Sequence, residues 1–213
     1  MALPEELQAC AGRVTELAVW SEELETLPAW LGQLAKLRTL ELRECYELEV
    51  LPDTVSQLSG LRVLHLIDCS GLTALPAGLG ALTRLEQLHL VGCCGLKELP
   101  AVLQALTRLA DLDLTWCYGL RALPAWLGAL TGLKDLQMIG CRGLTALPAG
   151  IGALTCLEDL NLDGCSGLTA LPDESRMYTA HMQDQSVRVL DHNQVTTHWV
   201  PSCISPRGPV TIR

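Results

Sequence analysis

Two histidines and an aspartate share one position of a repeated sequence, and these side chains could bind a metal. His65, His89 and Asp113 follow one another at intervals of 24 residues. If successive units lie side by side, the two imidazoles and the carboxylate stand next to each other, at a spacing that a zinc ion accepts. The sequence offers neither a fourth ligand nor residues that would orient these three. We therefore assign no metal and no cofactor.

The chain shows none of the usual catalytic patterns. It has no Ser-His-Asp order, no glycine loop suited to phosphate and no paired carboxylates in a predicted pocket. The segment 173–213 contains three histidines and Cys203, but it is too short for a catalytic domain. We expect a protein that is not an enzyme.

Cysteine is the third residue type that could do chemistry, and the chain has ten. Six recur every 24 residues and occupy one inward position of the repeat, where a cysteine serves the backbone of a turn by burial or hydrogen bonding. A disulfide or metal role is the alternative, although thiols of adjacent units point in the same direction. The six are Cys45, Cys69, Cys93, Cys117, Cys141 and Cys165; Cys10, Cys94, Cys156 and Cys203 lie outside this series.

The repeat is clearest in residues 61–84, LRVLHLIDCSGLTALPAGLGALTR, and its frame is LxxLxLxxCxxLxxLP. Alternation predicts a short strand, in which Leu64 and Leu66 point inward and the residues between them point outward. Pro76 ends any strand, and Leu79 and Leu82 suit one turn of tight helix. Because one unit cannot bury its leucines alone, the units must stack with their strands parallel. The segment 187–190 is the best further strand candidate, as a cap on the array.

The units Asp68–Cys93, DCSGLTALPAGLGALTRLEQLHLVGC, resemble the leucine-rich repeats of plant intracellular disease-resistance receptors and related eukaryotic proteins. The resemblance covers about residues 14–172 and implies an α/β solenoid with parallel strands on a concave face and short helical or 3-10 segments on a convex face. It also implies recognition of, or autoinhibitory contact with, a protein, and it brings no catalytic residue. We predict a partial N-terminal repeat at 1–13, a solenoid at 14–172 and a C-terminal tail at 173–213, which forms a partial cap and is then disordered.

The charge of the chain favours a protein partner over nucleic acid. The net charge is −9, and residues 1–172 hold 11 basic and 20 acidic side chains. A phosphate backbone demands clustered lysine and arginine, so nucleic acid and anionic membranes are excluded as partners. No run of about 18 apolar residues could span a membrane, and the N-terminus does not have the pattern of a secretory signal. We expect a cytoplasmic monomer.

The outward strand positions predict where a partner binds. An apolar group and an acidic group lie in three columns on the concave face, and an apolar patch rimmed by charge is typical of protein-binding surfaces. The acidic group could instead serve solubility. The predicted binding residues are Val63, His65, Ile67, His89, Val91, Asp111, Asp113, Asp135, Asp159 and Asp163.

These observations favour a non-catalytic module that binds a protein with a basic surface, in immune-type or signalling recognition. Two alternatives stay open. The array could be the substrate-recognition arm of a larger enzyme or ubiquitin ligase, or it could be a truncated receptor fragment.

Overall fold

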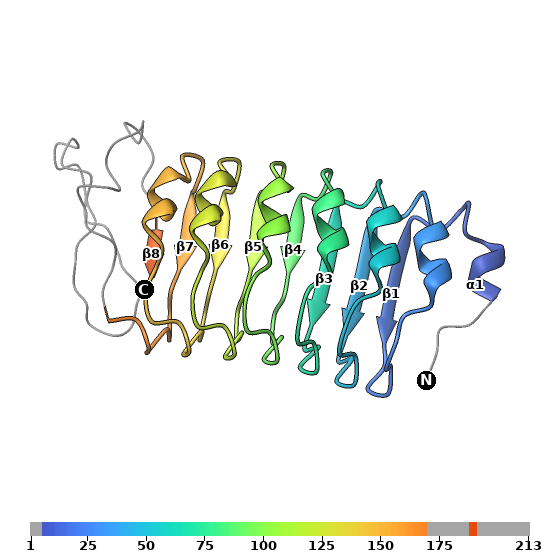
Figure 1. Cartoon of the computed structure of the whole chain (residues 1–213), viewed down its shortest axis with the longest axis horizontal. Helices are drawn as coiled ribbons and strands as arrows, with labels where there is room; N and C mark the ends of the chain where they lie inside the picture. Colours follow the sequence, from blue (N-terminus) through green and yellow to red (C-terminus); the bar gives the residue numbers. More distant parts are fainter. Residues whose placement is uncertain (1–5, 170–187, 191–213) are drawn as a thin grey trace.

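The computed structural model describes residues 6–169 and 188–190, and it forms one open, curved sheet of parallel strands (Figure 1). The strands pair in chain order from first to last. They are β1 (Glu16–Trp20), β2 (Thr39–Arg43), β3 (Val63–Ile67), β4 (Gln87–His89), β5 (Asp111–Asp113), β6 (Asp135–Gln137), β7 (Asp159–Asn161) and β8 (Arg188–Leu190). The sheet confirms the predicted solenoid.

Short 3-10 helices form the convex side and lie in front of the strands in Figure 1. A four-residue helix, α1 (Glu6–Ala9), precedes them. The 3-10 helices are η1 (Ala29–Gln33), η2 (Asp53–Gln57), η3 (Ala77–Ala81), η4 (Ala101–Ala105), η5 (Ala125–Ala129) and η6 (Ala149–Ala153). The predicted single turn of tight helix is therefore present in every full unit of the described array.

Each 3-10 helix follows a Leu-Pro pair, and the proline sets where it begins. Pro76 has a φ of −69° and precedes η3 in an extended conformation. The Leu79 amide donates to the Pro76 carbonyl at 3.1 Å, and the Leu82 amide donates to the Leu79 carbonyl at 3.0 Å. These i to i+3 bonds give the tight helix, in which Leu79 and Leu82 both point into the core.

The core is a stack of leucines, one layer per unit. In β3, Leu64 and Leu66 are fully buried, and the residues between and beside them are partly exposed. Leu64 pairs in register with Leu40 on one side and Leu88 on the other, so both neighbouring units cover it. Full burial of a leucine contributes roughly 1.5–3 kcal/mol, which a unit gains only when its neighbours are in place.

The six recurrent cysteines are all buried, as their inward position in the repeat predicts. Each of the later thiols donates to a backbone carbonyl of the preceding unit. Cys117 Sγ lies 3.0 Å from the Leu90 carbonyl, and Cys141 Sγ lies 3.0 Å from the Leu114 carbonyl. The Leu90 carbonyl also accepts from the Cys93 amide within its own turn. The cysteines therefore link each turn to the next without covalent bonds.

The predictions for the two ends of the array can be compared with the structure only within the described residues. At the N-terminal end, α1 packs near η1, and Gln8 Nε2 donates to Gln33 Oε1 at 3.1 Å. At the other end, β8 pairs with β7 in parallel, as expected for a capping strand. The predicted boundaries at 13 and 172 stay predictions, and the rest of the predicted tail, including Cys203 and its histidines, lies outside the described residues.

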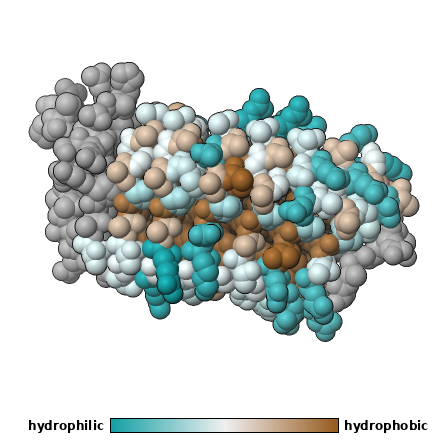
Figure 2. Space-filling view, viewed as in Figure 1, coloured by the Kyte–Doolittle hydropathy of each residue, from teal (hydrophilic) through white to brown (hydrophobic). Residues whose placement is uncertain are grey.

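The convex face carries much apolar surface. Figure 2 shows this face, on which brown, hydrophobic residues form a band across the middle, with hydrophilic residues above and below it. Trp30 and Trp126 are partly buried and pack against the core, so they cover it on the convex side. The strand face, which carries the predicted binding residues, lies on the opposite side.

Candidate interaction surface

Parallel pairing places the predicted binding residues in rows that cross the strands. The first row runs from Glu16 to Asp159 and the second from Ala18 to Asn161, in the order that the sequence predicts. All ten predicted residues are partly exposed: Val63, His65, Ile67, His89, Val91, Asp111, Asp113, Asp135, Asp159 and Asp163. Their placement on one face follows from the register, whereas their binding role stays a proposal.

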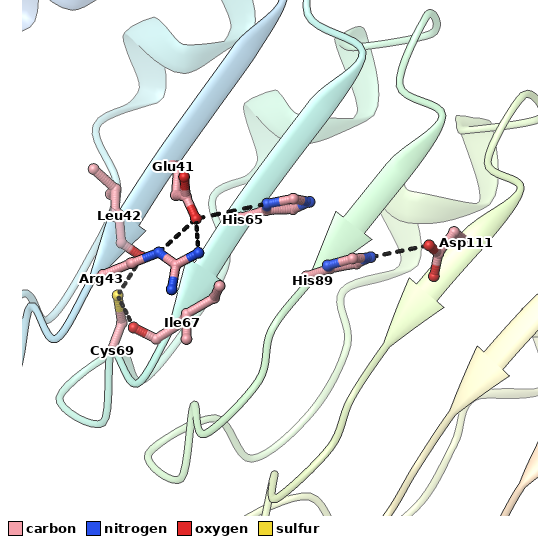
Figure 3. Close-up of polar contacts among 8 residues, drawn as sticks. All are labelled: Glu41, Leu42, Arg43, His65, Ile67, Cys69, His89 and Asp111. Carbon is pink, nitrogen blue, oxygen red and sulfur yellow. Dashed lines mark hydrogen bonds and ion pairs between the residues drawn. The ribbon is translucent and has the colours of Figure 1, made fainter. Parts of the chain in front are cut away.

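The two histidines form a stacked pair at the centre of this face (Figure 3). The ring centroids of His65 and His89 lie 4.2 Å apart, with 8° between the ring planes. His89 Nε2 contacts Asp111 Oδ2 at 3.1 Å, across the gap between β4 and β5. On the other side, His65 Nδ1 lies 3.9 Å from Glu41 Oε1. Glu41 also accepts a hydrogen bond from Arg43 Nε at 2.6 Å.

The three side chains that suggested a metal site are used differently. His89 pairs with Asp111 of the first row and not with Asp113, which shares its own row. Asp113 Oδ1 accepts from the Thr115 amide at 2.8 Å and so braces its own loop. Among residues 6–169 and 188–190, no three His, Cys, Asp or Glu side chains are grouped to hold a metal ion.

The two imidazoles have pKa values shifted in opposite directions. The hydrogen bond that Asp111 accepts raises the pKa of His89, and the charges of Asp111, Asp113 and Asp135 add to this effect. Burial lowers the pKa of His65, and the neighbouring His89 lowers it further. A proton on the pair therefore resides on His89, which faces the acidic side of the surface.

We expect the free energy of unfolding to pass through a maximum near pH 6.5. The raised pKa of His89 gives stability that is present below the unfolded value of 6.5 and is lost as pH rises through the folded pKa. The lowered pKa of His65 acts oppositely, because the unfolded chain binds its proton first as pH falls below 6.5. Urea unfolding between pH 5 and 8.5 measures both limbs.

Two matched variants separate the limbs of this profile. His89→Gln should remove the loss above pH 6.5, and His65→Gln should remove the loss below it. Each effect should be about 1 kcal/mol or less, since both side chains are partly exposed. A profile that neither substitution alters would contradict the assignment.

An acidic row lies beside the histidines. Asp111, Asp135 and Asp159 occupy equivalent positions of β5, β6 and β7, and Arg188 follows them in register on β8. Burial raises the pKa of Asp135, against a hydrogen bond from Gln137 Nε2 at 2.7 Å, and the carboxylates of Asp111 and Asp159 raise it as well. The three charges thus act on one another.

An apolar group lies on the N-terminal half of the same face. Val63, Ile67 and Val91 are partly exposed, as the sequence predicts. Ile67 and Val91 belong to a third row across the units. This row continues through Thr115 to Ile139. Thr115 is 8% exposed and therefore buried, although an outward strand position would be open. Ile139 therefore extends this apolar group to the repeat unit that carries Asp135 of the acidic row.

A third feature, which the strand pattern does not predict, lies at the edge where the strands end. Trp116 and Tyr118, in the loop after β5, are 47% and 45% exposed. The Arg142 guanidinium lies over the Tyr118 ring, 5.7 Å from its centroid. We call these three residues the aromatic edge. A signal was available, because Trp116 occupies the repeat position at which Gly92, Gly140 and Gly164 stand.

Stacked parallel strands, Leu-Pro turns and a ladder of buried cysteines together define a leucine-rich repeat solenoid. Residues 16–118 match the family described as a leucine-rich repeat region. Comparison with curated proteins gives no match. In the described part of the chain, no helix has the length and apolar character needed to cross a membrane.

Solved structures of bacterial proteins share this fold. The leucine-rich repeat domain of the type III effector XopL matches with a TM-score of 0.73 and 26% identity, covering 90% of this chain and 73% of that one. A leucine-rich repeat protein of Leptospira interrogans gives 0.62 and 24%, covering 78% and 50%. Internalin C2 of Listeria monocytogenes gives 0.55 and 18%, covering 85% and 83%. The predicted resemblance to plant receptors stays a prediction.

Proposed function

We propose that this chain is a non-catalytic module that binds a protein through its concave face. One observation supports this proposal most directly. The acidic row of Asp111, Asp135 and Asp159 lies on the same face as the partly exposed Val63, Ile67 and Val91. Leucine-rich repeat folds generally serve protein interaction, which supports the proposal at the level of class. The fitting partner has a basic and partly apolar surface.

Electrostatics gives the acidic row a role in recruitment. Adjacent strands lie about 4.8 Å apart, so carboxylates on neighbouring strands of this row lie well within the Debye length of about 8 Å at physiological salt. Their mutual repulsion costs stability, since the carboxylates of Asp111 and Asp159 add to the rise in the pKa of Asp135 that burial causes in the first place. Lysine or arginine of a partner relieves this repulsion and accelerates association, while the apolar contact slows dissociation.

The biological setting that we propose is recognition inside the cell, in immune-type or signalling contacts, by a monomer. A second setting is favoured by one comparison. The similar domain of XopL is one domain of a type III effector, which is consistent with this array acting as the recognition arm of a larger protein. Both settings use the same concave face.

We expect neutralisation of the acidic row to slow partner association at least tenfold at low salt and to leave the fold intact. The variant replaces the acidic row, Asp111, Asp135 and Asp159, and the neighbouring Asp113 with asparagine. Proteins captured by the wild-type chain are identified, and their association rates are measured at 50 and 300 mM salt by surface plasmon resonance. Relief of like-charge repulsion should keep the melting temperature unchanged or raise it slightly.

A control variant carries the same change of charge away from the concave face. It replaces four exposed acidic residues outside the strands by their amides: Glu47, Glu49, Asp53 and Glu98. The control should retain the wild-type association rate and salt dependence. If both variants behave alike, or if the wild-type rate is independent of salt, the acidic row serves solubility and the proposal fails.

A further inference from the structure

Trp116 has a backbone conformation that suits a glycine. Its φ is +61°, and the glycines at the equivalent position of three other units have φ values of +69° to +70°. Within residues 6–169 and 188–190, the other non-glycine residues with positive φ are Glu44 and Asp68, which are polar. A side chain as bulky as tryptophan is disfavoured in the left-handed region by its Cβ. The fold itself would be served better by glycine here.

The neighbouring unit leaves room for the indole. A Cβ atom added to Gly140 would lie 2.8 Å from Trp116 Cδ1 and 3.8 Å from Tyr118 Cε1, so both rings converge over this glycine. The absence of a side chain at Gly140 therefore leaves space for the indole, and Trp116 remains about half exposed. Rigid aromatic side chains lose little entropy on binding and are enriched among residues that dominate interface energies.

The chemistry of the aromatic edge favours an aliphatic contact. Arg142 already lies over the Tyr118 ring, so a cation of a partner gains little there. The exposed indole of Trp116 continues the apolar surface that Val91 and Ile139 begin on either side of Thr115. Strand β5 brings Asp113 within three residues of Trp116, which corresponds to roughly 10 Å. An aliphatic group on the indole can therefore belong to a segment whose basic residues reach the acidic row.

We infer that the aromatic edge anchors the partner of the concave face. The partner places a proline or leucine side chain on the Trp116 indole, next to lysine or arginine residues that lie along Asp111, Asp135 and Asp159. This inference rests on the proposed function and adds a second contact to it. The unfavourable backbone conformation of Trp116 is retained for binding and not for folding.

Two synthetic peptides test the anchor, each with four lysines: (Lys-Pro-Leu)4 and (Lys-Ser-Gly)4. The chain is labelled with 5-fluorotryptophan, and its 19F spectrum is recorded during titration, with the Trp116 signal assigned by its loss in Trp116→Gly. We expect (Lys-Pro-Leu)4 to bind at least tenfold more tightly than (Lys-Ser-Gly)4 and to move the Trp116 signal. Trp116→Gly should remove most of the preference for (Lys-Pro-Leu)4 over (Lys-Ser-Gly)4, without lowering the melting temperature, and the apolar group of Val63, Ile67 and Val91 accounts for the remainder.

Trp20→Ser is the matched control, because Trp20 is 70% exposed at the far end of the array and lies outside the aromatic edge. It should bind both peptides like the wild type. Tyr118→Ser is a second variant and should weaken only (Lys-Pro-Leu)4. The anchor is overturned if both peptides bind equally with the Trp116 signal unmoved, or if Trp116→Gly lowers the melting temperature and keeps the affinity. Failure of both peptides to bind more tightly to the wild type than to the fourfold asparagine variant overturns the proposed function as well.

Discussion

Replacing Leu112 with alanine should lower the free energy of unfolding by about 2–5 kcal/mol, which is the range for leucine truncation in a packed core. Leu112 is 1% exposed at the centre of β5, and Leu88 and Leu136 flank it in register. Since both neighbouring units depend on this layer, the cavity weakens two interfaces together. Urea unfolding followed by circular dichroism measures the loss.

Leu17→Ala is the matched control for the Leu112→Ala substitution. Leu17 is the equivalent residue of β1, but it lies at the end of the array and is only partly buried. Its truncation should cost about half as much or less, because less apolar area is removed from the core. Equal losses at the two positions would mean that the units unfold independently and that central layers have no additional support.

The period of the sequence predicts the register, and the register determines most of the fold. Because Leu64, Leu88 and Leu112 recur every 24 residues, a parallel stack is the arrangement that buries all of them. Burial of alternate residues then fixes which side chains face outward. The same reasoning places Asp111, Asp135 and Asp159 in one row, as the structure has them.

Contacts between rows could not be predicted in this way. A repeat pattern gives the neighbour across the strand, whereas His89 turns diagonally to Asp111 instead of pairing with Asp113. That choice depends on side-chain rotamers and on competition for each carboxylate, since the Thr115 amide already occupies Asp113. The 24-residue repeat shows which positions are equivalent. It does not show with which neighbour each side chain forms a hydrogen bond.

The aromatic edge was missed for a related reason. Outward strand positions follow from the alternation of leucines, but Trp116 lies just beyond the strand, in a loop where the repeat specifies only the cysteine. Its meaning depends on the backbone conformation, which the sequence reveals only through the glycines of other units. A bulky residue at a position where other units of the repeat have glycine therefore indicates a role other than folding.

Cys93 and Cys117 should resist alkylation in the folded chain, by a factor of about a thousand or more relative to the exposed cysteines. Burial raises the pKa of Cys93 to about 12, from an ordinary value of 9.0. Each pKa unit reduces the thiolate fraction tenfold near neutral pH, and the thiolate is the reacting species. Burial also raises the pKa of Cys117. The reagent must in addition reach a sulfur that has no exposed surface.

Iodoacetamide labelling followed by mass spectrometry of peptides measures each site separately. Cys10 and Cys156 are exposed and serve as internal controls that should react within minutes, and Cys94 is partly exposed and should react next. The six recurrent cysteines should react only after urea is added. Rapid labelling of Cys93 or Cys117 in the folded chain would contradict their placement in the core.

Labelling also connects the cysteines to the leucine layers. If a buried thiol reacts only when its unit opens, its labelling rate follows the free energy of that opening. Leu112→Ala should therefore accelerate labelling of Cys117, in the same unit, and of Cys141, whose thiol donates to the Leu114 carbonyl of that unit, more than that of Cys45 near the other end. Uniform acceleration at all sites would instead show that the array opens as one cooperative body, since every thiol would then report the same transition.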